Sequence, residues 1–194
     1  MLKDLFVSEV RVKILKTMLS TPEKPFHVRG LVRAVKTEIN AVRRELDRLT
    51  NATVLRKRQS GNRIYYNLNT SSIYFPELLS LVAKEEGLGA DIIKNIKKLG
   101  GVQFSLISRA FLRGRQSTAL DVDLFIVGDT VNIPVLQEII KRHETLLGKE
   151  INYTVMGEEE FIFRKRKNDS FISKLLSQSR TMLVGDEEEF STVY

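Results

Sequence analysis

The feature that most constrains this chain is the way the spacing of its apolar residues changes along the first third of the sequence. Three successive runs have the spacing of amphipathic helices, with two prolines after the first run and a Lys-Thr pair after the second. Ser8 has a suitable side chain for the N-cap of the first run. The predicted helices extend from Ser8 to Leu19, from about His27 to Val35 and from about Ile39 to Asn51.

Two runs typical of β-strands follow the third helix. Val54–Gln59 and Arg63–Leu68 flank the turn Ser60–Asn62, which contains a glycine, and this pattern predicts a β-hairpin. Two helices, a short turn, a third helix and a hairpin form the order of a winged helix-turn-helix domain. In such a domain the third helix enters the major groove of DNA.

The charge of the chain is divided unevenly. The whole sequence has a formal net charge of +7, but residues 1–70 hold 15 Lys and Arg against 6 Asp and Glu, whereas residues 71–194 hold 16 against 18. The basic excess therefore lies in the first third, as expected for a surface that binds nucleic acid. The alternative is a basic face that is only solvated.

The basic and amide side chains of this region predict how DNA would be bound. Arg and Asn on the third helix can pair with guanine and adenine, while the second helix and the hairpin supply contacts to phosphates. The candidate DNA-binding residues are Arg29, Arg33, Lys36, Asn40, Arg43, Arg44, Arg56, Lys57, Arg58, Asn62 and Arg63.

The stretch NAVRRELDRLTNATVLRKRQSGNRIYYNLN is similar to the winged-helix domains of small bacterial and archaeal repressors, and the resemblance extends from about Leu5 to Asn69. Thr53 stands where these domains usually have glycine after the recognition helix. The resemblance implies a double-stranded DNA-binding protein, most simply a transcriptional regulator. A winged helix used only for protein contacts is the alternative.

Residues 71–99 are expected to form a helical connector. One helix is predicted from Glu77 to Glu86, Gly87 and Gly89 interrupt the pattern, and a second helix continues to Leu99. The apolar face of the first helix comprises Leu78, Leu79, Leu81 and Val82. This face could form the seam of an expected homodimer or pack against the chain's own domains, and the sequence leaves both open.

Residues 100–194 have the alternating pattern of an α/β domain. Strands are predicted at Val102–Ile107, Asp121–Asp129 and Ile151–Val155, with a turn segment after the first and a helix at Ile133–Leu147 after the second. Two carboxylates, Asp121 and Asp123, lie two apart and would share one strand face. They are candidate ligands for Mg²⁺. The expected fold is therefore α+β, with domains at 1–70, 71–99 and 100–194.

The motifs Arg113-Gly114 and Asp121-Val122-Asp123-Leu124 resemble those of the minimal nucleotidyltransferases of the DNA polymerase β superfamily. The resemblance implies nucleotide binding at Arg109, Arg113 and Gly114 and a metal at the two aspartates. Two departures stand out, because the family's Gly-Ser falls on Arg109-Ala110 and its third carboxylate falls on Asn152. We therefore expect transfer chemistry to be lost and no cofactor to be required, with Mg²⁺ or a nucleotide as optional ligands. Active transfer, ligand sensing and a structural or dimerising role all stay open.

From the remaining features we expect a cytoplasmic protein. It has no cysteine, its N-terminus lacks the uninterrupted apolar core of a signal peptide, and no window approaches the length of a membrane span. The acidic run Glu187–Glu189 near the C-terminus is predicted to be a mobile end.

Overall fold

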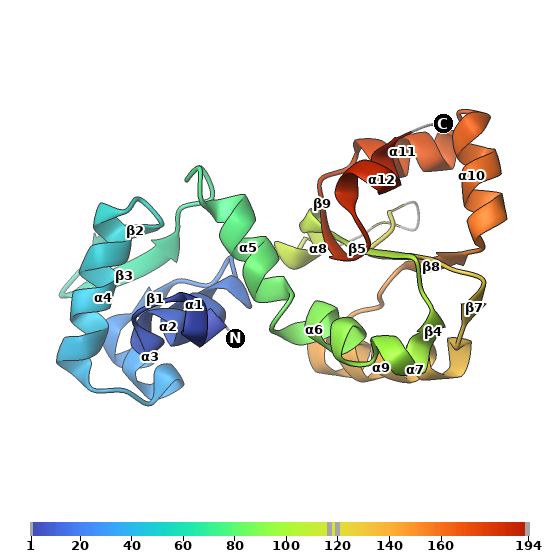
Figure 1. The fold of residues 1–194 in the computed structure, drawn as a ribbon. Coiled ribbons are helices and arrows are strands. Elements are labelled where there is room, and N and C mark those ends of the chain that lie inside the picture. Colours follow the sequence, from blue (N-terminus) through green and yellow to red (C-terminus); the bar gives the residue numbers. More distant parts are fainter. Residues whose placement is uncertain (1, 116–117, 119–120, 193–194) are drawn as a thin grey trace. The chain divides into compact units, whose positions relative to one another are not determined.

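The computed structural model describes residues 2–115, 118 and 121–192, and it has a mixed α+β fold (Figure 1). The chain divides into two compact units, the first ending at Glu86 and the second beginning at Gly87. The stretch that the sequence predicts as a connector is thus shared between the two units. Among the described residues, no helix is long and apolar enough to cross a membrane.

The first unit contains the helices that the spacing predicts. Their bounds are α1 (Leu2–Leu5), α2 (Glu9–Leu19), α3 (Val28–Val35), α4 (Ile39–Asn51) and α5 (Phe75–Ala83). Ser8 caps α2 as expected, because its hydroxyl accepts a hydrogen bond from the Arg11 N–H group. Ile14, Leu31 and Leu46, one from each of three helices, are fully buried where α2, α3 and α4 meet.

A small antiparallel sheet completes the first unit. Its strands are β1 (Phe26–His27), β2 (Leu55–Ser60) and β3 (Arg63–Leu68), in the order β1-β3-β2. Ser60 pairs with Arg63, so the hairpin loop consists of Gly61 and Asn62, and Gly61 has a φ of +57°. Strand β1 is not predicted from the sequence. A two-residue strand has too little periodicity to be recognised.

One charged side chain lies in the core of the first unit. Glu45 of α4 is 5% exposed, and its carboxylate accepts hydrogen bonds from Arg11 at 2.7 Å and from Arg48 at 2.8 Å. Burial alone would raise the pKa of Glu45, but the hydrogen bonds and charges of the two arginines lower it below its ordinary value. Because Arg11 belongs to α2, the pair joins α4 to α2.

Thr53, which follows α4, has a strained backbone. Its φ is +59°, a left-handed conformation that is uncommon for any L-residue and least favourable for a β-branched one. The conformation is held because Val54 donates to the carbonyl of Leu49 and Asn69 donates to the carbonyl of Thr53. Thr53 stands where the sequence resemblance leads us to expect glycine. Its presence leaves the fold intact but strains the backbone locally.

We predict that Thr53→Gly stabilises the first unit. Relief of the left-handed strain outweighs the greater flexibility of glycine in the unfolded chain by about 0.5–1 kcal/mol. The matched control is Ala52→Gly, since Ala52 has a φ of −75° and should lose stability on the same change. Hydrogen exchange of the α4 amides in the full chain measures both effects, and equal responses of the two variants would contradict the strain at Thr53.

The second unit is built on a four-stranded sheet of order β8-β6-β5-β9, in which β6 and β8 are parallel and the other pairs antiparallel. Its strands are β5 (Phe104–Ser108), β6 (Leu124–Val127), β8 (Tyr153–Met156) and β9 (Arg180–Val184), with a separate pair β4 (Gly100–Gly101) and β7 (Thr130–Val131). Its helices are α6 (Gly87–Lys94), α7 (Ile96–Leu99), α8 (Arg109–Leu112), α9 (Ile133–Leu147), α10 (Glu158–Arg166), α11 (Ser170–Ser177) and α12 (Glu187–Ser191).

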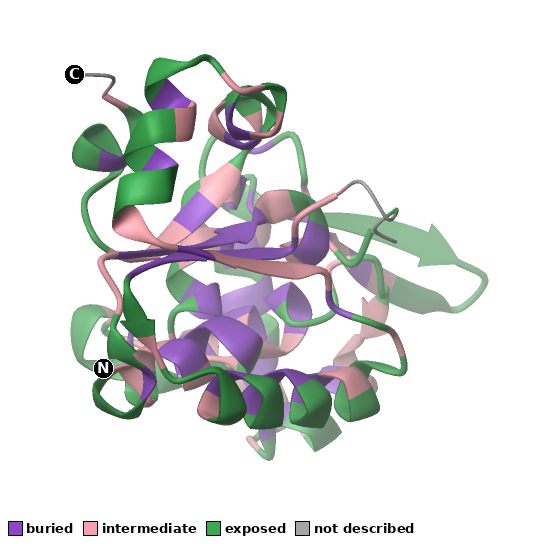
Figure 2. Cartoon of the chain, turned by 90° about the vertical axis from the view of Figure 1, so that its right-hand side faces the viewer, coloured by how far each residue is buried: buried purple, intermediate pink, exposed green. Residues whose placement is uncertain are grey.

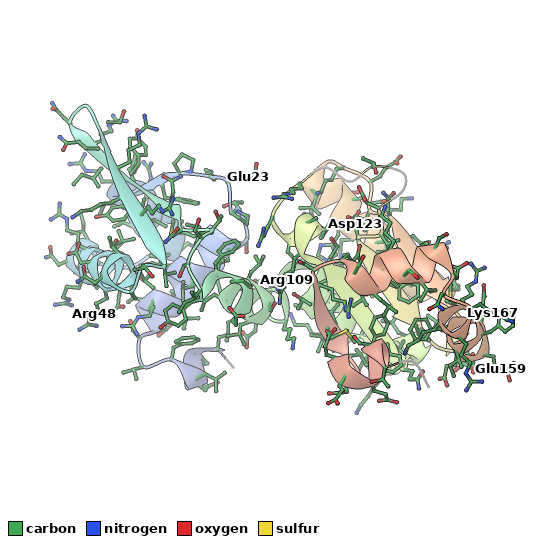
Figure 3. All side chains as sticks on the ribbon, turned by 90° about the horizontal axis from the view of Figure 1, so that it is seen from above. Glu23, Arg48, Arg109, Asp123, Glu159 and Lys167 are labelled. Atoms are coloured by element: carbon green, nitrogen blue, oxygen red, sulfur yellow. The ribbon has the colours of Figure 1, made fainter. Side chains whose placement is uncertain are left out.

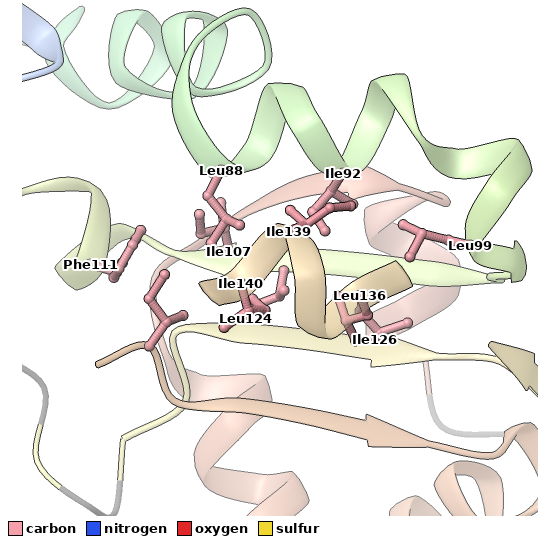
Figure 4. Packing of buried hydrophobic residues seen from close by; sticks show 11 residues of the cluster. Leu88, Ile92, Leu99, Ile107, Phe111, Leu124, Ile126, Leu136, Ile139 and Ile140 are labelled. Atoms are coloured by element: carbon pink, nitrogen blue, oxygen red, sulfur yellow. The ribbon is translucent and has the colours of Figure 1, made fainter. Parts of the chain in front are cut away.

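Helices cover both faces of this sheet, as Figures 1 and 2 show. Alternate residues of the central strands face opposite sides. Leu124 and Ile126 of β6 join a cluster with α6, α7 and α9, which Figure 4 shows from close by. Phe125 and Val127 join a second cluster with α10, α11 and α12. Burial of both faces explains why β6 is a continuous apolar run.

Several expectations for the second unit need correction. Strand β6 begins at Leu124, so Asp121 and Asp123 lie in the loop before it and do not share a strand face. The segment after β5, expected to be only a turn, contains α8 because Ser108 caps a helix there. Gly89 does not interrupt the helix but lies buried within α6.

The C-terminal acidic run is also not a mobile end. Glu187–Glu189 form the first turn of α12, where Asp186 caps the helix, and Phe190 of the same helix is fully buried. The buried ammonium of Lys165 donates to the Phe190 carbonyl at 2.6 Å. The burial of Phe190 and the Asp186 cap of α12 therefore hold in place a segment whose acidic composition alone indicates mobility.

Candidate functional site

The basic surface of the first unit consists of the eleven candidate DNA-binding residues. All eleven are exposed, and within the described part of the chain none of their side chains has a salt-bridge or hydrogen-bond partner. They belong to α3 and its C-cap, the first half of α4, the two strands β2 and β3, and the loop between these strands. The fold therefore leaves these basic and amide side chains available to an external ligand.

Helix α4 has two chemically different faces. Val42, Glu45, Leu46 and Leu49 are buried against the rest of the unit, while Asn40, Arg43, Arg44 and Asp47 are exposed. This division follows the 3.6-residue period, so the exposed arginines and asparagine lie on the outward face together.

Sequence reasoning missed the N-cap of α4. The carboxylate of Glu38 accepts hydrogen bonds from the N–H groups of Asn40 and Ala41 at 2.8–2.9 Å, and these bonds lower the pKa of Glu38. Glu is not among the preferred capping residues, and this explains why the sequence did not indicate it. The cap places a negative charge near Arg43 and Arg44, whose positive charges lower the pKa of Glu38 further.

The hairpin extends beyond the core of the first unit. From Arg56 to Ser60 every residue of β2 is exposed on both faces, and Leu55 is the only buried residue of the strand. Figure 2 shows the hairpin as an exposed two-stranded ribbon. Beyond Leu55, strand β2 carries Arg56, Lys57 and Arg58 in succession and has no apolar face to bury, which fits a surface for contacts outside the chain.

The first unit also has an open apolar cavity of about 400 Å³ between α2, the end of α4 and the start of α5. Its lining is almost entirely apolar, although two arginines and a glutamate border it. Leu5, Val7, Ile73 and Tyr74 are exposed close to it along the chain. The lining residues are Phe6, Arg11, Leu15, Arg48, Leu49, Ala52, Val54, Tyr74, Glu77 and Leu78.

In the second unit, Asp123 lies in the loop directly before β6 and beside Asn152. Asp123 is 1% exposed, and its Oδ2 accepts a hydrogen bond from the Asn152 N–H group at 3.0 Å. The Asn152 carbonyl accepts in turn from the N–H group of Asp123 at 2.7 Å. Asn152 is thus beside Asp123, and it supplies N–H donors to its neighbours.

Asp121 is partly exposed and makes a different set of contacts. Its Oδ2 accepts from the Thr118 N–H group at 2.9 Å and from the Thr118 hydroxyl at 2.8 Å, and its Oδ1 lies 3.4 Å from the Lys174 ammonium. These contacts lower the pKa of Asp121. Neither Thr118 nor Lys174 is indicated by the sequence motif, because Lys174 comes from α11, about fifty residues away.

The segment after β5 contains Arg109 in α8, followed by Arg113 and Gly114, and Figure 3 labels Arg109 and Asp123. Its backbone N–H groups have internal partners. Ser108 Oγ accepts from Ala110 at 3.1 Å and from Phe111 at 3.4 Å, and the Ser179 carbonyl accepts from Arg109 at 3.0 Å. The sequence resemblance implies that these backbone N–H groups would bind phosphate. Here they donate to acceptors within the chain instead. The Nε atom of Arg109 is buried without a hydrogen-bond partner among the described residues.

The chain has little similarity to known proteins. No known protein family matches the sequence, and no curated protein matches it. The chain is similar to a crystal structure of a mutant of the toxin-antitoxin MntA-HpeT, with a TM-score of 0.33 and 14% identity over 53% of this chain and 80% of that chain. A likeness this distant establishes neither the fold nor the function of the chain.

We predict that the two aspartates differ in their contribution to stability. Asp123→Ala removes a buried acceptor from the Asn152 N–H group and should lower the free energy of unfolding of the second unit by about 1–3 kcal/mol. Asp121→Ala removes a largely exposed group and should change it by no more than about 1 kcal/mol. Hydrogen exchange of the β6 and β8 amides in the full chain measures the difference. A larger effect for Asp121 would contradict the structural role of Asp123.

Proposed function

We propose that the chain is a sequence-specific double-stranded DNA-binding protein that acts as a transcriptional regulator. The observation that carries the proposal is the group of eleven exposed basic and amide side chains, none with an internal partner among the described residues, on the elements where a winged helix contacts DNA. A solvated basic face would show the same exposure, and binding experiments therefore decide between the two.

The elements would have different roles in recognition. Helix α4 would enter the major groove, where Arg43 and Arg44 can donate to guanine and Asn40 can pair with adenine. Arg29 and Arg33 of α3, with the hairpin arginines, would contact phosphates and orient the protein. The first group would then determine which sequence is bound, and the second how tightly any DNA is bound.

A homodimer is part of this proposal. Leu79 and Val82 of α5 are buried within their own unit and are not available, but Tyr74 is 52% and Ile73 is 78% exposed beside the apolar cavity. A second copy that covers this surface would remove apolar area from water. Sedimentation of the full chain and of Tyr74→Glu tests the point, because the variant should then be monomeric.

For the second unit we propose a domain that resembles nucleotidyltransferases but does not transfer nucleotides. The satisfied amides around Ser108 and the hydrogen bonds of Asn152 support this proposal. Such a domain would serve as a sensor of an anionic ligand or as a structural part of the regulator. The competing candidate is an active transferase that the first unit directs to its target, favoured by the retained Asp121 and Asp123.

The first prediction from this proposal concerns salt. If the basic residues neutralise about 6–10 phosphates in a dimer, affinity for DNA should fall about 10³-fold or more between 50 and 200 mM salt. Changing Arg56 and Arg58 to Ala should reduce the slope of log K against log salt by about 0.9 for each phosphate that the variant no longer neutralises. Fluorescence anisotropy with a labelled duplex measures both, and a flat response would remove the DNA-binding proposal.

The second prediction is that radiolabelled ATP, GTP, CTP and UTP transfer no label to the protein or to acceptors in cell extract. In-line transfer requires metal ions positioned by several carboxylates and amides that hold the phosphates. Asp121→Asn serves as the control. Label transfer that this variant abolishes would restore the transferase.

A further inference from the structure

We infer that the ammonium group of Lys174 takes the place of the divalent cation that the nucleotidyltransferase resemblance implies at Asp121 and Asp123. The inference deepens the proposed function and rests on the part of it that concerns the second unit. On this inference the residues present do not fit a metal, and Lys174, which lies outside every motif in the sequence, has a role at this site.

The oxygen atoms that a metal would need are already engaged. Mg²⁺ binds about six oxygen ligands and favours carboxylates. Both oxygens of Asp121 and the Oδ2 atom of Asp123 have partners within the chain, namely Thr118, Lys174 and the Asn152 N–H group. All of these partners are hydrogen-bond donors, and a donor directed at an oxygen competes with a cation for it.

Asn152 adds a further hydrogen bond to these internal contacts. Its Nδ2 donates to the Thr118 carbonyl at 2.8 Å, so this side chain links the loop before β6 to β8. Among the described residues no group of three or more Asp, Glu, His or Cys could hold a metal ion. None of the positions outside the described ranges is an acidic residue either. The described residues therefore provide no third carboxylate at this strand end.

Lys174 supplies a positive charge beside Asp121. It projects from α11 and lies 3.4 Å from Asp121 Oδ1, and the two side chains are 52% and 45% exposed. An exposed pair of this kind contributes little to stability. Its removal should leave the fold intact and expose the carboxylate, so the role of Lys174 can be tested directly.

The test is a titration of the full chain with Mn²⁺, in which electron paramagnetic resonance measures the free ion. The wild type should bind Mn²⁺ weakly or not at all. Lys174→Met removes a unit charge that lies beside Asp121 and should tighten binding about tenfold. Adding Asn152→Asp should tighten it further, and adding Asp121→Asn to Lys174→Met should abolish the gain.

Lys167→Met is the matched control, because it makes the same change in charge at an exposed lysine that Figure 3 shows well away from Asp123. It should change the affinity for Mn²⁺ by less than about twofold. Tight binding by the wild type, or no gain in Lys174→Met at an unchanged melting temperature, would overturn the inference. Label transfer and DNA binding are measured separately, so failure here is distinguishable from failure of the proposed function.

Discussion

The arrangement of the first unit depends on one buried carboxylate. Glu45 lies on the apolar stripe of α4 between Val42 and Leu46, where an unpaired charge would be strongly unfavourable. Its pairing with Arg11 of α2 fixes the rotation of α4 about its own axis. Because that face is turned inward, Asn40, Arg43 and Arg44 must face outward. The same interaction thus secures the core and presents the side chains proposed to contact DNA.

The second unit uses its polar groups in the opposite way. Its loop before β6 retains two aspartates, but the chain itself satisfies them through Thr118, Asn152 and Lys174. The N–H groups at the start of α8 likewise donate to the Ser108 hydroxyl and the Ser179 carbonyl. A catalytic site would keep such groups available for substrate. Here Asn152 links β8 to the loop before β6, and Ser108 caps α8, which supports the proposed structural or sensing role for this unit.

The sequence predicted most where a pattern repeats over several turns. Helices α4 and α9 have the predicted bounds because their apolar spacing continues over three or more turns. The fold of the C-terminal segment could not be predicted in the same way, because β9 and α12 are short and depend on distant partners such as Lys165 and Phe104. For the candidate DNA-binding residues, the helical period predicted which side chains of α4 are exposed. The pairing of Lys174 with Asp121 could not be predicted, because it arises from tertiary structure alone.

The most direct test of the central claim is selection of DNA sequences by the wild type, Arg43→Ala and Arg58→Ala from a random library. If α4 reads base edges, Arg43→Ala should lose preference at particular positions, with discrimination reduced by about 1–3 kcal/mol for a bidentate pair. Arg58→Ala should weaken all sequences about equally and retain the preferred site. Uniform weakening by both variants, with the preferred site unchanged, would contradict the proposed role of α4.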